Sequence, residues 1–319
     1  MTIRRTTSRV AFAHPVILLL LVAACGSSPS SPSRSLSPGT TRSISSSTMA
    51  RTTPPNSSNT TSSSTSTTTA PTSTPSLPVG EEIRLPDYED RPTLLQRGPD
   101  ANSPLVVVFH GSRGSIENIQ KRSGLHLDGP AAGVAVLWLS GKPLPKRSWN
   151  TNNRCCDPAS THRVDDMAYI DAALEAVRSA GLSPARIITA GVSNGAGMAV
   201  SVACKRPKVF SAAVSVAGWM PVSCRNTSVS LLAIGGTKDD VVGRNKPKQM
   251  AKTWRQFVVQ CPDNPTKETY GAAHIATWRR CSSSTFVRLV VLDDIEHLWP
   301  RFEFYDATAD IIRVALGKV

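Results

Sequence analysis

The sequence predicts an α/β fold with a mostly parallel central sheet and helices on both of its faces. Short apolar runs alternate with longer segments of helical periodicity, and the runs are continuous enough to be strands buried on both faces. Such alternation favours parallel strands joined by helices. The expected strands are residues 105–109, 134–139, 187–190, 212–216, 229–234 and 286–292, and the expected helices are 164–180, 196–204, 248–259 and 307–316.

Residues 1–24 have the features of a bacterial lipoprotein signal peptide. Arginines come first, residues 16–22 form an apolar run too short to span a membrane, and two alanines precede Cys25. The segment ending at Cys25 looks like a lipobox, in which the cysteine is lipidated and becomes the mature N-terminus; the alternative is an ordinary cleaved signal with an incidental cysteine. We expect an exported lipoprotein held in the cell membrane, facing the extracellular side or the cell envelope.

Residues 25–79 consist largely of Ser, Thr and Pro and contain no acidic residue. A segment of this composition cannot bury a core, so we expect a disordered tether, either glycosylated or bare. Residues 80–319 then suit one globular domain.

The net charge of +13 indicates little about partners. Six of the 36 Lys and Arg residues lie before residue 80, so the domain carries 30 basic and 23 acidic residues, a net charge of +7. These charges are scattered, without a basic run interleaved with aromatics, which argues against nucleic-acid binding. We expect a monomer that contacts the membrane only through its lipid.

Residues 191–195 read Gly-Val-Ser-Asn-Gly between a predicted strand and a predicted helix. This is the setting of a nucleophile elbow, in which a sharp turn exposes a serine and the helix N-terminus faces developing negative charge. The pattern therefore predicts acyl transfer on an α/β-hydrolase fold, with Ser193 as the nucleophile.

In that fold the acid and then the histidine follow the serine along the chain. Of the two histidines after Ser193, His297 follows a predicted strand by a short loop, whereas His274 lies in a polar stretch bounded by cysteines. We therefore choose His297 as the base. The loop after strand 229–234 offers Asp239 as the first choice of acid and Asp240 as the second.

Strand 105–109 opens into a glycine-rich loop. In this arrangement the loop donates one backbone N–H to the oxyanion hole and the residue after the nucleophile donates the other. These residues are Ser112 and Asn194. His110 precedes the serine in the chain, so we interpret it as a structural loop residue.

Several further motifs occur in a fixed order along the chain. They are His110-Gly111, Trp149-Asn150 before Cys155-Cys156, Val164-Asp165-Asp166, Ser193-Asn194-Gly195, Gly236-Thr237-Lys238-Asp239 and His297-Leu298-Trp299-Pro300. In these motifs the chain resembles the secreted poly(3-hydroxybutyrate) depolymerases and feruloyl esterases, the serine esterases of carbohydrate esterase family one, from near residue 97 to residue 312. The resemblance implies Ser193, Asp239 and His297 as the triad. Ser112 stands where the family usually has a cysteine, but no departure removes a triad member.

Three tryptophans lie near predicted strand-end loops. We expect Trp299, two residues after the base, to form a wall of the acyl pocket, and Trp149 also to contact substrate. For Trp219 we favour packing in the core.

An even number of cysteines follows Cys25, which predicts three disulfides in an exported chain. We expect a disulfide between Cys261 and Cys281 because they lie close together in the sequence. The adjacent Cys155 and Cys156 are expected not to pair with each other, because bridge geometry strains a link between neighbours. The other four would then join the Trp149 loop to the region of the nucleophile helix, through Cys155, Cys156, Cys204 and Cys224. No metal-binding spacing is present in the sequence, and we expect no metal or cofactor.

The expected activity is that of a serine carboxylic ester hydrolase. Because the only expected appendage is the tether, and not a module that adsorbs to insoluble polyester, short acyl, acetyl or hydroxycinnamoyl esters are the preferred substrates. Three alternatives remain open: a poly(3-hydroxybutyrate) depolymerase, a peptidase with the same triad, and a non-catalytic surface-binding lipoprotein.

Overall fold

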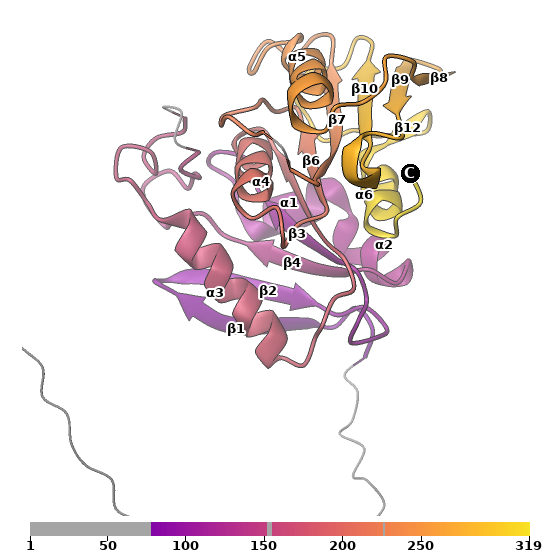
Figure 1. Cartoon of the computed structure of the whole chain (residues 1–319). Coiled ribbons are helices and arrows are strands. Elements are labelled where there is room, and N and C mark those ends of the chain that lie inside the picture. Colours follow the sequence, from indigo (N-terminus) through magenta and orange to yellow (C-terminus); the bar gives the residue numbers. More distant parts are fainter. Residues whose placement is uncertain (1–77, 152–154, 226) are drawn as a thin grey trace, which may run out of the picture. The chain divides into compact units, whose positions relative to one another are not determined.

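The computed structural model describes residues 78–151, 155–225 and 227–319 (Figure 1). Cys25, the predicted signal peptide and the predicted tether up to residue 77 lie outside the described residues. Contacts divide the chain into two units, Met1–Thr69 and Ala70–Val319, and everything described belongs to the second. In the described part, no helix is long and apolar enough to cross a membrane.

A ten-stranded sheet in the order β1-β2-β4-β3-β5-β6-β7-β10-β9-β8 forms the centre of the fold. The six strands from β4 to β10 in this order run parallel, and they are the six that the apolar runs predict. Their bounds are β3 Leu105–Phe109, β4 Ala135–Leu139, β5 Ile187–Val192, β6 Ala212–Val216, β7 Ser230–Gly236 and β10 Val287–Leu292.

An antiparallel pair of strands extends each edge of the sheet, and the sequence predicted neither pair. At one edge are β1 (Glu82–Tyr88) and β2 (Arg91–Gln96); at the other are β9 (Ala273–Trp278) and β8 (Thr266–Tyr270). The outer strands β1 and β8 are largely exposed and polar, so they lack the apolar run that marks the central strands. A separate two-stranded sheet pairs β11 (Arg301–Phe302) with β12 (Tyr305–Asp306).

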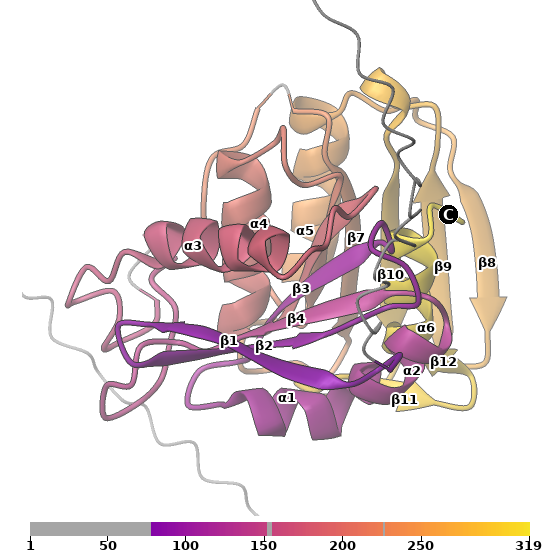
Figure 2. The same cartoon turned by 90° about the horizontal axis from the view of Figure 1, so that it is seen from below.

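Helices cover both faces of the sheet, on opposite sides in Figure 2. Alternate residues of β3 show why: Leu105, Val107 and Phe109 pack in one core cluster, and Val106 and Val108 in another. The first cluster includes residues of α3, α4 and α5, and the second includes residues of α1, α2 and α6. The helices are α1 Ile116–Ser123, α2 Leu125–Ala131, α3 Asp166–Ser179, α4 Asn194–Lys205, α5 Lys246–Thr253 and α6 Ala307–Ala315, with a π-helical turn η1 Trp254–Val258 after α5 and a 3-10 turn η2 Ser282–Ser284.

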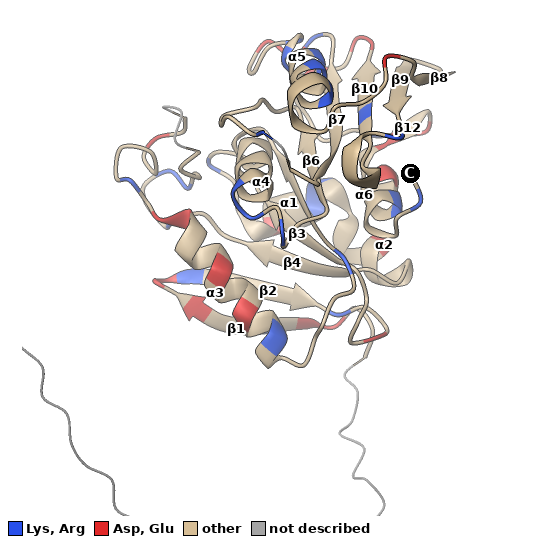
Figure 3. Ribbon diagram, in the orientation of Figure 1, with Lys and Arg blue, Asp and Glu red and all other residues tan. Residues whose placement is uncertain are grey.

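Basic and acidic residues are interspersed along the ribbon in Figure 3, with acidic positions concentrated on α3 and the neighbouring β1.

The structure corrects the disulfide pattern in part. Cys261 and Cys281 are bonded, as the sequence predicted, but Cys204 is bonded to Cys224 and Cys155 to Cys156. The prediction that the adjacent Cys155 and Cys156 do not pair with each other is therefore wrong: their Cα atoms are 2.9 Å apart and their sulfurs are bonded. No disulfide therefore joins the Trp149 loop to α4.

Candidate active site

Ser193 occupies the tight turn between β5 and α4. Its backbone has φ 56° and ψ −123°, in the positive-φ region that residues other than glycine rarely adopt. A Cβ atom on Gly195 would lie 2.2 Å from the carbonyl oxygen of Phe109, and one on Gly191 would lie 2.3 Å from the carbonyl oxygen of Gly195. The turn therefore requires both flanking glycines, and this close packing fixes the position of Ser193 at the start of the helix.

His297 is held by a buried carboxylate. Its Nδ1 lies 2.8 Å from Oδ2 of Asp239, which is 3% exposed, and Oδ1 of Asp239 accepts hydrogen bonds from the N–H groups of Val241 and Val242. Burial alone would raise the pKa of Asp239, but the hydrogen bonds from His297 and Val242 outweigh it and lower that pKa. An ionised Asp239 holds the proton on Nδ1 and leaves Nε2 of His297 to act as a base.

Ser193 and His297 line the same hollow, of about 340 Å³. Ser112 and Trp299 line it as well. A larger hollow of about 790 Å³ beside the N-terminus of α3 is lined by none of these residues.

Asp240, the second choice of acid, and His274, the histidine not chosen as base, have different surroundings. Asp240 is exposed, and its side chain makes no hydrogen bond to His297. His274, on β9, lies 2.8 Å from Oδ2 of Asp293 with both side chains about half exposed, and it does not line the hollow of Ser193.

The backbone N–H groups of Ser112 and Asn194 are both free to bind an oxyanion. Asn194 is the first residue of α4, where N–H groups have no partner within the helix. The residues after Ser112 are engaged: the N–H of Arg113 donates to the carbonyl of Arg147 at 2.6 Å, and that of Gly114 to the carbonyl of Gly111 at 3.0 Å. In the described part of the chain, no hydrogen bond uses the N–H of Ser112 or of Asn194.

Trp149, for which we predicted contact with substrate, is completely buried. Its backbone N–H donates to Oδ1 of Asn194 at 2.7 Å, and its carbonyl accepts from Nδ2 of Asn194 at 3.1 Å. Its indole N–H donates to the carbonyl of His110 at 2.8 Å, and its ring packs edge-on against Phe109. Trp149 therefore ties the elbow to the loop after β3, and so joins the two segments that would supply the oxyanion hole.

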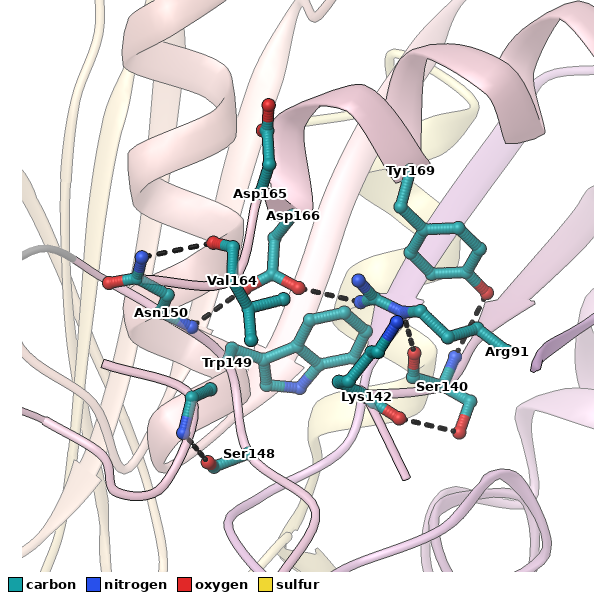
Figure 4. A network of polar contacts seen from close by, with 12 residues as sticks. Arg91, Ser140, Lys142, Ser148, Trp149, Asn150, Val164, Asp165, Asp166 and Tyr169 are labelled. Atoms are coloured by element: carbon teal, nitrogen blue, oxygen red, sulfur yellow. Dashed lines mark hydrogen bonds and ion pairs between the residues drawn. The ribbon is translucent and has the colours of Figure 1, made fainter. Parts of the chain in front are cut away.

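A buried ion pair between Arg91 and Asp166 lies beside Trp149 (Figure 4). Arg91 and Asp166 are 2.6 Å apart and almost inaccessible to solvent, and Oδ2 of Asp166 accepts the N–H of Asn150 at 2.7 Å. The guanidinium also donates to the carbonyl of Ser140 at 3.0 Å and lies 3.8 Å from the ring centre of Tyr169. Burial raises the pKa of Asp166 despite the adjacent charge of Arg91.

In the sequence, Asp166 stands out only as part of the motif Val164-Asp165-Asp166, and nothing there indicates Arg91. The two residues are 75 positions apart, and no local pattern joins them.

His110 has the structural role predicted for it. It is 1% exposed, its Nδ1 lies 2.7 Å from the carbonyl of Gly111, and its Nε2 accepts the N–H of Gly141 at 2.9 Å. Burial lowers the pKa of His110 to about 4, so the ring is neutral at pH 7. With both ring nitrogens engaged, His110 has no nitrogen left to act as a base.

The other two tryptophans differ in their surroundings. Trp299 lines the hollow of Ser193, and its indole N–H donates to Oγ1 of Thr308 at 3.0 Å. Trp219 was expected in the core but is only half-buried; it lines a separate hollow of about 520 Å³, where its ring lies against Gly197 of α4. The described residues include no group of three or more His, Cys, Asp or Glu side chains placed to hold a metal ion.

Solved structures with the same architecture include an acetyl xylan esterase from Aspergillus awamori. It superposes with a TM-score of 0.59 at 14% identity, covering 75% of this chain and 100% of that one. The chain has the α/β-hydrolase fold. An S-formylglutathione hydrolase from Agrobacterium tumefaciens matches with a TM-score of 0.50 at 13% identity, over 76% of this chain and 97% of that one. At these identities the likeness concerns the fold alone.

Two curated relatives match part of this hydrolase-fold chain. NocK of Nocardia uniformis subsp. tsuyamanensis, named provisionally as an esterase, is 34% identical over 37% of this chain and 33% of its own length. The protein named "Probable feruloyl esterase C" of Aspergillus niger is 29% identical over 45% of this chain and 52% of its own length. The matches thus span a third to a half of these relatives. No protein-family model matches the chain.

Proposed function

We propose that this chain is a carboxylic ester hydrolase with Ser193 as nucleophile, His297 as general base and Asp239 as the acid that orients it. One observation carries the proposal: a serine held at a strained strand-to-helix turn lines the same hollow as a histidine whose Nδ1 is bound to a buried carboxylate. Both curated relatives carry esterase names, which supports the same reaction class.

The reaction proceeds through an acyl-enzyme. Nε2 of His297 takes the hydroxyl proton of Ser193 while Oγ attacks the ester carbonyl, and the N–H groups of Ser112 and Asn194 stabilise the oxyanion. As the intermediate collapses, the imidazolium protonates the departing alcohol. Water, deprotonated by the same imidazole, then attacks the acyl-enzyme and releases the acid and Ser193.

The proposed substrates are short acyl, acetyl or hydroxycinnamoyl esters. A hollow of about 340 Å³ is at the small end of the range for ligand sites, which suits a short or single-ring acyl group. The name of the Aspergillus niger relative points to hydroxycinnamoyl esters within this group.

We also propose that the enzyme is exported and anchored through a lipid on Cys25. The three disulfides are consistent with an oxidising compartment outside the cytosol, and the lipobox-like segment before Cys25 supports the anchor.

The decisive experiment is active-site labelling. A fluorophosphonate probe should label the wild type and fail to label Ser193→Ala, and ester turnover should fall by about four to six orders of magnitude in that variant. Labelling that persists in Ser193→Ala would move the nucleophile to another residue. A folded wild type that is never labelled would favour a binding protein without catalysis.

A substrate panel then separates the reaction classes. It comprises p-nitrophenyl esters, methyl ferulate, acetylated xylan, hydroxybutyrate oligomers and peptide amides, each assayed against Ser193→Ala. Turnover confined to hydroxybutyrate polymers would make the enzyme a depolymerase, and cleavage of amides alone would make it a peptidase.

A further inference from the structure

Two arginines line the hollow that Ser193 and His297 share, and no acidic residue does. Arg113 lies in the loop after β3, and Arg122 lies in the last turn of α1. The remaining wall includes apolar side chains, among them Ile119, Leu298 and Trp299. Both arginines are exposed, and we call the part of the lining to which they belong the rim of the hollow.

Neither arginine is neutralised by the protein. In the described part of the chain, the guanidinium groups of Arg113 and Arg122 form no ion pair and no hydrogen bond. Arg301, just beyond Trp299, provides the contrast, because it contacts Asp128 at 2.7 Å and Asp306 at 3.2 Å. The charge at the rim is therefore free to act on a ligand.

The acidic residue of α1 does not cancel this charge within the hollow. Glu117 is exposed and does not line the site. A hydrogen bond with the Ser115 side chain is the largest cause that lowers the pKa of Glu117, and the charge of Arg147 lowers it further.

A backbone hydrogen bond fixes the position of the Arg113 main chain. Arg113 follows the proposed oxyanion donor Ser112, and its own N–H donates to the carbonyl of Arg147 at 2.6 Å. Its backbone φ of 62° is in the left-handed region, which residues other than glycine adopt rarely and at a cost in conformational energy. A charged residue is thus held one position from the reaction centre in a conformation that glycine would adopt more easily.

We infer that the ester cleaved at this site carries a carboxylate, which Arg113 and Arg122 bind while the apolar wall receives the carbon skeleton. This inference rests on the proposed function and names its substrate class. Guanidinium groups bind carboxylates with charge-assisted, often bidentate hydrogen bonds. An acid-free rim imposes no repulsion that would offset this gain. The carboxylate can belong to the acyl part or to the alcohol part of the ester.

Two matched pairs of esters test the inference and distinguish these two sources. For the acyl part, mono-4-nitrophenyl adipate is compared with 4-nitrophenyl hexanoate, which replaces the distal carboxylate with a methyl group. For the alcohol part, 4-carboxyphenyl acetate is compared with 4-carbamoylphenyl acetate, each rate being divided by its hydroxide-catalysed rate. The measured quantity is the ratio of kcat/KM, charged over neutral, within each pair.

The variants are Arg113→Gln, Arg122→Gln and the double variant. Arg313→Gln on α6 is the control, since it removes the same charge from an exposed arginine outside the hollow. We expect the wild type to prefer the charged ester in at least one pair. The double variant should lower that ratio about tenfold, and Arg313→Gln should leave it within about twofold of the wild type. Raising the salt from 0.05 to 0.5 M should lower the wild-type ratio as well, because exposed charges are screened.

The inference is overturned if the wild type prefers the neutral ester in both pairs, or if the double variant leaves the ratio unchanged while its melting temperature matches that of the wild type. In either case, ester turnover that is lost in Ser193→Ala would still support the proposed function. If none of the four esters is hydrolysed and no fluorophosphonate label forms, the proposed function fails and the inference fails with it.

Discussion

The surroundings of three histidines show how individual residues acquire different roles in this fold. His297 has one nitrogen on a buried carboxylate and lines the hollow of Ser193. His274 also faces a carboxylate, that of Asp293, but this pair is exposed to solvent and apart from the hollow. His110 lines the hollow, yet both of its nitrogens are engaged by backbone groups. Only the first combines an oriented ring with an unused nitrogen at the site.

Replacing the two carboxylate-bound histidines should therefore have opposite outcomes. His297→Ala should lose nearly as much esterase activity as Ser193→Ala, because the serine then has no base. His274→Ala should retain most of the activity. Turnover of p-nitrophenyl acetate by each purified variant measures this. Loss of activity in His274→Ala alone would contradict the assignment of the base.

The buried ring of His110 should make stability depend on pH. Its pKa is about 4 in the folded protein and 6.5 in the unfolded chain, so between these values only the unfolded chain binds the proton. This contribution to stability is fully present above about pH 6.5 and is lost as the pH falls toward 4. The loss is on the order of 3 kcal/mol.

Urea unfolding at pH 7 and pH 4 measures this loss for the wild type and for His110→Gln, whose amide can still reach the same backbone groups. We expect the variant to lose less stability over this interval, by about the same 3 kcal/mol. An equal loss in both proteins would mean that other groups cause it.

At the scale of elements, the start of α3 has both a capping carboxylate and a buried one. The side chain of Asp165 accepts the N–H of Ala168 and is exposed, whereas Asp166 turns inward to Arg91 of β2 and to the N–H of Asn150. The inward carboxylate thus joins α3, strand β2 and the Trp149 segment that holds Asn194. A buried ion pair adds little net stability, but removing one partner leaves a costly unpaired charge.

Neutralising each aspartate in turn separates these two contributions. Asp166→Asn should lower the free energy of unfolding by about 3–5 kcal/mol, because Arg91 keeps its charge without a partner. Asp165→Asn should cost at most about 1 kcal/mol, since asparagine also caps helices well. Urea denaturation gives both values. Equal losses would show that Asp166 acts only as part of the helix start.

The strands that the sequence predicted are those marked by a continuous run of mostly apolar residues. Residues 105–109 are apolar throughout and residues 212–216 are apolar except for Ser215, and the structure places strands there with the same bounds. Strand β8 reads Thr-Lys-Glu-Thr-Tyr and is held by pairing with β9, which no local pattern reports. In the same way, chain order predicts Ser193 and His297 as triad members, whereas the burial of Trp149 follows from contacts with residues far along the chain.

At the scale of the whole domain, sheet order explains why these distant residues meet. Ser112, Ser193, Asp239 and His297 follow β3, β5, β7 and β10, all parallel strands of one sheet. The carboxyl ends of parallel strands lie at one edge, so the loops after them converge although they span residues 112–297. All of these groups belong to the described domain, so catalysis should not depend on the N-terminal segment.

The proposed anchor at Cys25 can therefore be removed without touching the site. Expressed in a bacterial host, the wild type should partition into membranes and into Triton X-114, because a lipidated N-terminus binds the bilayer. Cys25→Ser should appear in the soluble exported fraction with the same kcat on p-nitrophenyl acetate, since Ser193, His297 and Asp239 are unchanged. Ser27→Ala serves as the matched control, because it alters the same segment and keeps the cysteine. If Cys25→Ser stayed with the membranes, or if the wild type were already soluble, the lipid anchor would be wrong and the catalytic proposal would be unaffected.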